Sequence, residues 1–170
     1  MDLKDAIRSI PNFPEEGIIF RDITTILQNG KYFKQSIEQM AEAAAQFNFD
    51  VIAGPESRGF IFGTPLAYKL EKGFVPVRKK GKLPYKTISR SYDLEYGSDT
   101  IEIHIDAIAK GDRVLIIDDL LATGGTARAI VDLIEEAGGI IAGVLCLIEL
   151  EALNGRKLFD GYEVRALMEY

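Results

Sequence analysis

Apolar side chains recur along the chain at two different periods. In one kind of segment they return every three or four residues, as they do from Phe33 to Phe47, and so lie on one face of an α-helix. Glycine residues follow such segments closely, where helices commonly end. This pattern predicts three main helices, over residues 31–47, 58–71 and about 125–137.

The first residues show a shorter version of the same pattern. Leu3, Ile7 and Ile10 share one helical face, and Pro11 would end this short helix. A segment rich in proline and glycine, residues 11–18, follows it.

The second kind of segment is a short apolar run, typical of a buried strand. Such runs predict strands at residues 50–54, 74–77, 114–118, 140–150 and 163–168. One further segment alternates, so that Ile101, Ile103 and Ile105 would face inward and Glu102 and His104 outward. Strands that alternate with helices favour an α/β fold with a parallel sheet, in which ligands bind at the carboxyl ends of the strands.

Length and composition narrow the class of protein. The chain of 170 residues, 47% of them hydrophobic, fits a single domain over residues 1–170. Its net charge of −6 argues against nucleic-acid binding as the main task. A single cysteine, Cys146, lies in an apolar run and is expected in the core of a protein from a reducing compartment. Neither a signal-peptide pattern nor an apolar run of about 18 residues is present, so we expect no membrane contact and a cytoplasmic location.

Residues 81–97 lack a clear periodicity and contain glycine, proline, serine and several tyrosines, which predicts a mobile loop. A group of cations adjoins the start of this segment, at Arg78, Lys79, Lys80 and Lys82. Such a group is usually a solvated charge run. Here it directly follows a predicted strand end, which favours an anion site instead.

The segment from Val114 to Ala127 carries the strongest chemical signal. Its apolar strand delivers Asp118 and Asp119 to a carboxyl end, and a loop rich in glycine and threonine follows. Gly124 and Gly125 permit positive φ, so backbone N–H groups could surround a phosphate at the start of the next helix. Carboxylates accept hydrogen bonds from a vicinal diol, so the pair and the loop together suggest a sugar phosphate. A plain connection between strand and helix is the alternative.

Two other kinds of phosphate site are excluded by their missing motifs. The pattern Gly-x-x-x-x-Gly-Lys-Ser/Thr of P-loop proteins is absent. The early Gly-x-Gly-x-x-Gly of dinucleotide-binding folds is absent as well.

The same segment resembles the phosphoribosyl-pyrophosphate (PRPP) binding motif of the type I phosphoribosyltransferases. Its amino-acid sequence is most similar to that of the adenine-specific members. Three further motifs support the resemblance over nearly the whole chain, in the same order. They are Gly17-Ile-Ile-Phe-Arg-Asp-Ile23, Gly54-Pro-Glu-Ser-Arg-Gly59 with the residues to Gly63, and Val77-Arg-Lys-Lys-Gly-Lys-Leu-Pro84 with Tyr92-Asp-Leu-Glu-Tyr-Gly97.

The resemblance implies a fold, an activity and partners. The fold would be a mostly parallel sheet flanked by helices, with a small N-terminal hood at about residues 1–30 and a flexible catalytic loop at about residues 81–97. The activity would be transfer of the 5-phosphoribosyl group from PRPP to adenine, which gives AMP and pyrophosphate in purine salvage. Mg²⁺ would be bound mainly through PRPP and pyrophosphate, with no site made by the protein alone. The resemblance also implies a homodimer, in which the leading basic residues reach the neighbouring subunit.

The resemblance further assigns roles to single residues. Asp118 and Asp119 would hold the ribose hydroxyls, and we expect one of these adjacent carboxyls to have a raised pKa. Glu95 would exchange a proton with the purine, Arg58 would assist catalysis, and Tyr96 would form part of a lid. The other assignments are the 5′-phosphate to Ala122, Thr123, Gly124, Gly125 and Thr126; pyrophosphate to Glu56, Ser57, Arg58, Arg78, Lys79 and Lys82; and adenine to Ile19, Phe20 and Arg21.

Two structural details accompany these roles. A cis peptide bond is expected between Glu56 and Ser57, before the helix. His104, the only histidine, matches no catalytic position of the family and is expected at the surface.

Three alternative functions stay open on the sequence alone. The first is a related enzyme that takes guanine, hypoxanthine, xanthine or orotate. The second is a regulator that uses this fold as a PRPP sensor, although such proteins commonly carry a winged-helix domain that this chain has no room for before its first strand. The third is a receiver domain, in which the acidic pair would belong to the first strand rather than lie two-thirds of the way along the chain.

Overall fold

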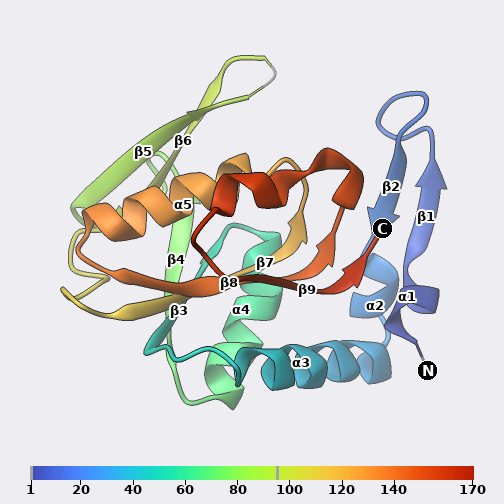
Figure 1. Ribbon diagram of the computed structural model, residues 1–170, viewed down its shortest axis with the longest axis horizontal. Coiled ribbons are helices and arrows are strands. Elements are labelled where there is room, and N and C mark those ends of the chain that lie inside the picture. The colour runs from blue at the N-terminus through green and yellow to red at the C-terminus, as the bar shows by residue number, and fades with distance from the viewer. Residues whose placement is uncertain (1, 95) are drawn as a thin grey trace.

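The computed structural model describes residues 2–94 and 96–170, and its centre is a mixed sheet (Figure 1). In these residues the sheet has seven strands in the order β5-β6-β4-β3-β7-β8-β9. Five neighbouring strands are parallel, and β6 and β5 join the edge at β4 as antiparallel strands. The strands are β3 (Val51–Pro55), β4 (Gly73–Lys79), β5 (Thr87–Asp93), β6 (Ser98–His104), β7 (Arg113–Leu121), β8 (Ile140–Glu149) and β9 (Val164–Glu169). The predicted α/β fold with a mostly parallel sheet is confirmed.

Helices cover both faces of the sheet. The helices α3 (Gly30–Ala44) and α4 (Arg58–Lys69) lie on one face and α5 (Gly125–Glu136) on the other (Figure 1). Alternate residues of β7 explain this arrangement. Leu115 and Ile117 pack in the hydrophobic cluster with α3 and α4, whereas Val114 and Ile116 pack in the cluster with α5.

The order of the strands reverses between β3 and β7. From β3 the chain crosses to β4 on one side, and from β7 it crosses to β8 on the other. The connections therefore leave the sheet in opposite directions and open a crevice at the carboxyl ends of β3 and β7. Such a switch point is the usual ligand site of open α/β sheets.

The N-terminal residues form a separate small unit, the hood. It contains α1 (Leu3–Ala6), β1 (Arg8–Pro11), β2 (Ile19–Asp22) and α2 (Thr24–Leu27). The predicted helix through Ile10 is wrong beyond Ala6, because Arg8–Pro11 pairs with Ile19–Asp22 as an antiparallel strand. Three apolar residues at helical spacing are too few to stabilise a helix in isolation, and the hairpin satisfies the backbone instead.

The residues predicted as a loop over 81–97 are mostly a β-hairpin. Thr87–Asp93 pairs along its whole length with Ser98–His104, which corrects that prediction. Ile88 and Tyr92 of β5 pack against the α5 side of the core, although the polar residues between them hide the alternation. In β6 the buried faces also differ from the prediction, because Glu102 is buried and Ile105, beyond the end of the strand, is exposed.

Two short 3-10 helices connect β8 to β9. They are η1 (Glu151–Leu153) and η2 (Gly155–Phe159). The expected core position of Cys146 is confirmed, since this residue of β8 is buried in the cluster that contains α5. Within residues 2–94 and 96–170, no helix combines the length and the apolar character that a membrane span requires.

Candidate active site

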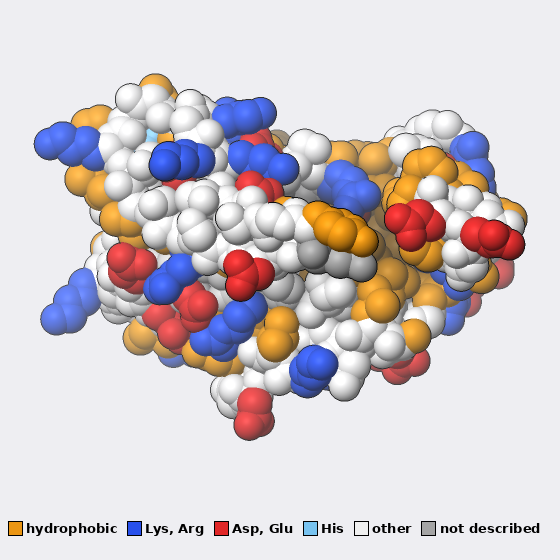
Figure 2. Space-filling view, turned by 90° about the horizontal axis from the view of Figure 1, so that it is seen from above, with side chains coloured by type: hydrophobic (Ala, Val, Ile, Leu, Met, Phe, Trp, Pro, Cys, Tyr) orange, Lys and Arg blue, Asp and Glu red, His pale blue; other side chains and the backbone are white. Residues whose placement is uncertain are grey.

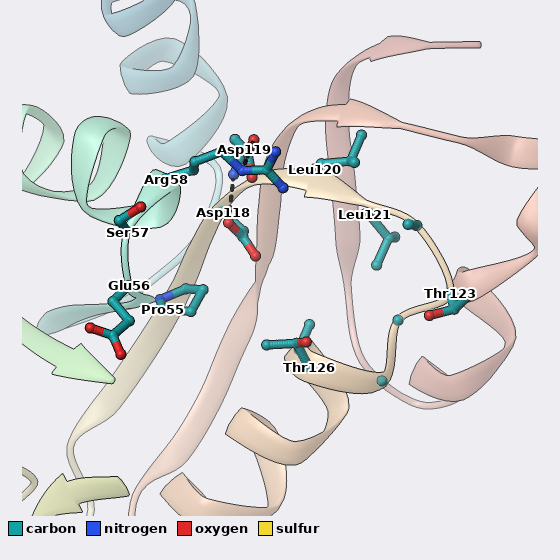
Figure 3. A pocket seen from close by; sticks show the side chains of 14 residues that line it. Pro55, Glu56, Ser57, Arg58, Asp118, Asp119, Leu120, Leu121, Thr123 and Thr126 are labelled. Carbon is teal, nitrogen blue, oxygen red and sulfur yellow. Dashed lines mark hydrogen bonds and ion pairs between the residues drawn. The ribbon is translucent and has the colours of Figure 1, made fainter. Parts of the chain in front are cut away.

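A pocket of about 400 Å³ lies at the switch point of the sheet (Figure 3). Its walls come from two segments that the sequence places far apart. The first, residues 55–58, joins β3 to α4, and the second, residues 118–127, runs from the end of β7 into α5. Figure 3 shows Ser57 and Arg58 on one side of the pocket and Thr123 on the opposite side.

The acidic pair lines this pocket. Asp119 is 3% exposed, and its backbone N–H donates a hydrogen bond to Asp118 Oδ1 at 2.8 Å. Burial in the protein, and then the negative charge of Asp119, raise the pKa of Asp118 well above its usual range. The expected raised pKa in this pair is thus confirmed at Asp118. A carboxyl that is poorly solvated gains from a ligand that brings hydroxyl donors or a cation.

Arg58 connects the two segments. Its Nε atom lies 3.0 Å from Asp119 Oδ2, while about half of its side chain stays open to solvent. Arg58 stands in the first turn of α4 and Asp119 near the end of β7, so this ion pair joins the two segments that line the pocket. The guanidinium carries further N–H donors, which are able to face an anion in the pocket.

The loop Ala122–Gly124 and the first residues of α5 have the form of an anion nest. Gly124 adopts a left-handed conformation with φ 87°, as the sequence predicts, whereas Gly125 begins the helix without a positive φ. The first N–H groups of a helix have no partner within it, and the helix dipole favours a negative group there. All five residues predicted to bind the 5′-phosphate line the pocket. The side chain of Thr126 also reaches Tyr92 of the hairpin, at 3.2 Å between the two hydroxyl oxygens.

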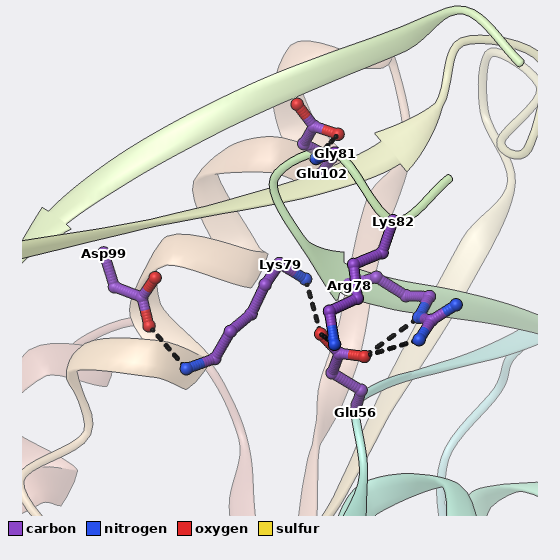
Figure 4. A network of polar contacts seen from close by, with 7 residues as sticks. All are labelled: Glu56, Arg78, Lys79, Gly81, Lys82, Asp99 and Glu102. Atoms are coloured by element: carbon purple, nitrogen blue, oxygen red, sulfur yellow. Dashed lines mark hydrogen bonds and ion pairs between the residues drawn. The ribbon is translucent and has the colours of Figure 1, made fainter. Parts of the chain in front are cut away.

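The segment from Glu56 to Arg58 has the predicted cis peptide bond between Glu56 and Ser57. The carboxylate of Glu56 points to the basic residues at the end of β4 and just after it (Figure 4). Arg78 Nε and the Lys79 backbone N–H each donate to it at 2.9 Å, and Lys82 Nζ lies 4.0 Å away. Partial burial acts to raise the pKa of Glu56, but the hydrogen bonds from Lys79 and Arg78 outweigh it and lower that pKa. Glu56 therefore contacts the charged groups of Arg78 and Lys82 and the backbone of Lys79, three of the residues that the sequence assigns to pyrophosphate.

A second pocket of about 200 Å³ adjoins the first and shares Pro55, Glu56 and Thr126 with it. Arg78 and Lys79 line this smaller pocket. Lys79 Nζ pairs with Asp99 Oδ2 at 3.2 Å, and this hydrogen bond raises the pKa of Lys79. The two pockets thus place the predicted cations next to the predicted phosphate loop.

The residues assigned to adenine lie on the hood. Ile19 is 51% exposed, and the Phe20 ring packs edge-on against Phe13 at 5.2 Å. Figure 2 shows a hollow between the hood and the rest of the molecule, with hydrophobic side chains on both sides of it. The side chain of Arg21 is engaged elsewhere. Its guanidinium stacks on the ring of Tyr170 at 4.1 Å and donates a hydrogen bond to Ser9.

The predicted catalytic Glu95 lies outside the described residues. Tyr96, the predicted lid residue, is 88% exposed at the turn between β5 and β6. His104 is only partly exposed. Its Nε2 atom accepts a hydrogen bond from the Tyr85 N–H at 3.3 Å.

Several pocket residues were not singled out by the sequence. Pro55, Leu120, Leu121 and Ala127 line the larger pocket, and Tyr92 and Asp99 line the smaller one. Tyr92 lies in one of the motifs that carry the family resemblance, so that motif could have indicated Tyr92 as a site residue. No sequence signal indicated Asp99, because the residue comes close to its partner Lys79 only through the pairing of β4 with β6.

No three or more His, Cys, Asp or Glu side chains in residues 2–94 and 96–170 are grouped so as to hold a metal ion. Two carboxylates, those of Asp118 and Asp119, nevertheless stand together in the pocket. They offer oxygen ligands of the type that Mg²⁺ prefers, although fewer than an octahedral ion needs.

Comparison with known proteins agrees with this geometry. Residues 22–167 match the phosphoribosyl transferase domain family. The chain is 57% identical over 171 residues to the adenine phosphoribosyltransferase of Acetivibrio thermocellus, with 100% of both chains covered. It is 59% identical over 170 residues to the adenine phosphoribosyltransferase of Brachyspira hyodysenteriae, again with 100% of both covered.

Solved structures give the same result. The adenine phosphoribosyltransferase of Thermoanaerobacter pseudethanolicus superposes with a TM-score of 0.95 at 54% identity, covering 99% of this chain and 98% of that one. The Saccharomyces cerevisiae enzyme, solved with an imino-altritol bisphosphate and adenine, gives a TM-score of 0.90 at 43% identity, with 97% and 96% covered. The chain therefore belongs to the type I phosphoribosyltransferase family. The relatives named here are its adenine-specific members.

Proposed function

We propose that this chain transfers the 5-phosphoribosyl group from PRPP to adenine and releases AMP and pyrophosphate. One observation carries the assignment: a single pocket brings Asp118 and Asp119 together with the nest Ala122–Thr126 and with Ser57 and Arg58. A sugar with a phosphate at one end and a pyrophosphate at the other needs an anion site for each end and hydrogen-bond acceptors for the hydroxyls between them.

The reaction forms a bond between C1 of the ribose and a purine nitrogen while the bond from C1 to pyrophosphate breaks. Positive charge develops on the ribose ring, and negative charge grows on the departing pyrophosphate. Asp118 and Asp119 would accept hydrogen bonds from the ribose hydroxyls, and their negative charge would stabilise the ring. Arg58, Arg78 and Lys79 would stabilise the pyrophosphate.

The ends of the substrate would be held by backbone groups. The N–H groups of residues 122–126 would bind the 5′-phosphate at the start of α5. Ser57 and Arg58, both exposed to the pocket, would bind pyrophosphate at the start of α4. Glu56 would act on that group indirectly, because its carboxylate is occupied by Arg78 and Lys79.

The base would occupy the hollow beside the hood. Ile19 and Phe20 offer apolar surface and backbone groups that suit a flat purine. Arg21 would keep the hood in place through Tyr170 rather than touch the base with its guanidinium. Glu95 would exchange a proton with the purine, and Tyr96 would help to exclude water from the site.

Mg²⁺ would neutralise the pyrophosphate charge, with the substrate supplying most of its oxygen ligands. The aspartate pair fits a contributing role, because these two carboxylates lack enough partners to hold the ion alone. We also propose a homodimer, as the resemblance to the family implies, and a cytoplasmic location, which the single buried cysteine, Cys146, supports.

The direct test is AMP formation from adenine and PRPP in the presence of Mg²⁺, run beside hypoxanthine and guanine. The proposal expects AMP from adenine and far slower turnover of the two oxopurines. Faster use of hypoxanthine or guanine would replace the proposed substrate with one of the alternatives.

A further inference from the structure

The phosphate loop rests on the 3-10 helix η2, which the proposed function leaves without a role. Gly155, the first residue of η2, is buried directly behind the loop. A Cβ atom on Gly155 would lie 2.3 Å from the carbonyl oxygen of Ala122 and 3.0 Å from the carbonyl carbon of Thr123. These are backbone atoms, so they could not move without changing the course of the loop.

The contact is equally close from the other side. A Cβ atom on Gly124 would lie 2.9 Å from the Gly155 carbonyl oxygen, with Leu158 and Phe159 just beyond it. Phe159 is buried in the core cluster of α5, which anchors the far end of η2. One face of the loop therefore lines the pocket, and its other face is packed backbone to backbone against η2.

An ion pair between a buried glutamate and a partly exposed arginine fixes the position of η2. Arg156 Nε donates to Glu149 Oε1 at 3.0 Å, its Nη2 donates to the other carboxylate oxygen, and its Nη1 donates to the Val164 carbonyl. The Glu149 residue is 5% exposed, whereas 44% of the Arg156 side chain is exposed. A buried carboxylate is costly without a partner, and the two-pronged pairing fixes the direction of the guanidinium as well as its distance.

Glu149 also stands beside the loop. It is the last residue of β8 and is paired in register with Leu121, the last residue of β7 before the loop begins. The pair Glu149–Arg156 thus connects the strand that leads into the phosphate loop with the helix that supports the loop from behind.

We propose that Gly155 and the Glu149–Arg156 pair are positioning residues, which hold residues 122–124 in the shape that binds the 5′-phosphate of PRPP. This inference rests on the proposed function of that loop. None of the three residues lines either described pocket, so they would act only through the loop backbone. Their replacement should weaken ligands that carry a sugar 5′-phosphate and spare pyrophosphate, which binds between β3 and α4.

The first experiment compares Gly155→Ala with Gly30→Ala. Gly30 has open space around its Cβ position, so that variant controls for the added methyl group. Calorimetry with Mg²⁺ would measure the affinities for ribose 5-phosphate and, separately, for pyrophosphate. Gly155→Ala is expected to weaken ribose 5-phosphate about 10- to 100-fold, as displaced binding groups do. Pyrophosphate affinity should stay within about twofold, because the two sites are separate.

The second experiment replaces Arg156 by Ala and by Lys, with Arg165→Ala as the matched control. Arg165 is 39% exposed in its side chain and pairs with Glu163 near the start of β9. Arg156→Ala should raise the KM for PRPP with little change in the KM for adenine, and Arg156→Lys should recover part of that loss. If Gly155→Ala does not fold, these variants decide the question.

Three results would overturn the inference. They are unchanged ribose 5-phosphate affinity in the folded variants, an equal loss of pyrophosphate affinity, or a PRPP effect no larger than that of Arg165→Ala. Failure of the wild-type protein to bind ribose 5-phosphate would instead refute the proposed function of the loop. The two failures are therefore distinguishable.

Discussion

Arg58 and Asp119 form an ion pair of 3.0 Å between the first residue of α4 and a residue near the end of β7. Each of the two residues is assigned to a different part of PRPP, the arginine to pyrophosphate and the aspartate to ribose. Without substrate they neutralise each other across the pocket. In the proposed function, the remaining N–H donors of Arg58 would turn to the pyrophosphate when substrate binds, so the pair would set the separation of the two subsites.

Replacing Arg58 by alanine should reduce kcat/KM for PRPP by about 10- to 100-fold, because a hydrogen bond to a charged group contributes about 1.5–3 kcal/mol. Inhibition by pyrophosphate should weaken in parallel. Arg8→Ala is a suitable control, since Arg8 is 53% exposed and also pairs with an aspartate, Asp22, outside the pocket. Steady-state kinetics would measure this loss, and an unchanged kcat/KM for PRPP would remove Arg58 from the site.

The raised pKa of Asp118 predicts a dependence of stability on pH. The folded protein binds this proton more tightly than the unfolded chain does, so stability falls as pH rises from the ordinary aspartate pKa through the raised one. Asp118→Asn removes that loss and should raise the melting temperature at neutral pH without ligand. The melting temperature should rise by about 2–4 °C for each kcal/mol of unfolding free energy gained, and the gain should vanish in acid.

Asp22→Asn is the comparison variant, because the contribution of Asp22 to stability depends on pH with the opposite sign. Hydrogen bonds from Thr24 lower the pKa of Asp22, so its charge stabilises the fold at neutral pH and this contribution is lost as pH falls. Thermal melts of both variants across pH would test the assignment. A melting-temperature difference for Asp118→Asn that is constant with pH would contradict it.

Glu56→Gln separates two effects of a carboxylate placed near an anion site. If Glu56 orients Arg78 and the loop at Lys79, its loss should weaken pyrophosphate binding, even though a negative charge has been removed. If it acts only as a charge, pyrophosphate should bind more tightly. We expect the first outcome, measured as product inhibition. Glu38→Gln, which breaks a surface pair with Lys69, is the control.

Glu95→Gln should reduce kcat by about 10²–10⁴, the usual contribution of general acid–base catalysis. The KM for PRPP should change little, because the glutamate is assigned to the base and not to the phosphates. Glu95 lies outside the described residues, so this prediction rests on the sequence motif. Single-turnover measurements would isolate the chemical step, and an unaltered rate there would assign the proton transfer to another group.

Much of the fold and the phosphate site follows from the sequence because local rules dominate there. The apolar runs of β3, β7 and β8 are buried on both faces, and buried strands of this kind leave a clear signal. Gly124 at positive φ and the start of α5 follow from the same short motif.

The remaining features depend on long-range contacts that a single segment does not encode. The strands β1 and β5 become strands only through their partners β2 and β6, so their weak periodicity misled the prediction. Arg21 shares a motif with Phe20 but turns to Tyr170, the last residue of the chain. Glu56 likewise uses its carboxylate on cations that follow it by more than twenty positions.

The central claim is that the nest before Ala127 binds a phosphate monoester while Asp118 and Asp119 bind the ribose. A crystal structure with AMP, grown without sulfate or phosphate, tests it most directly. The account predicts the 5′-phosphate at the N–H groups of residues 122–126, with the ribose hydroxyls donating to the two carboxylates. AMP bound with its phosphate elsewhere, or with its ribose away from the aspartates, would contradict the account.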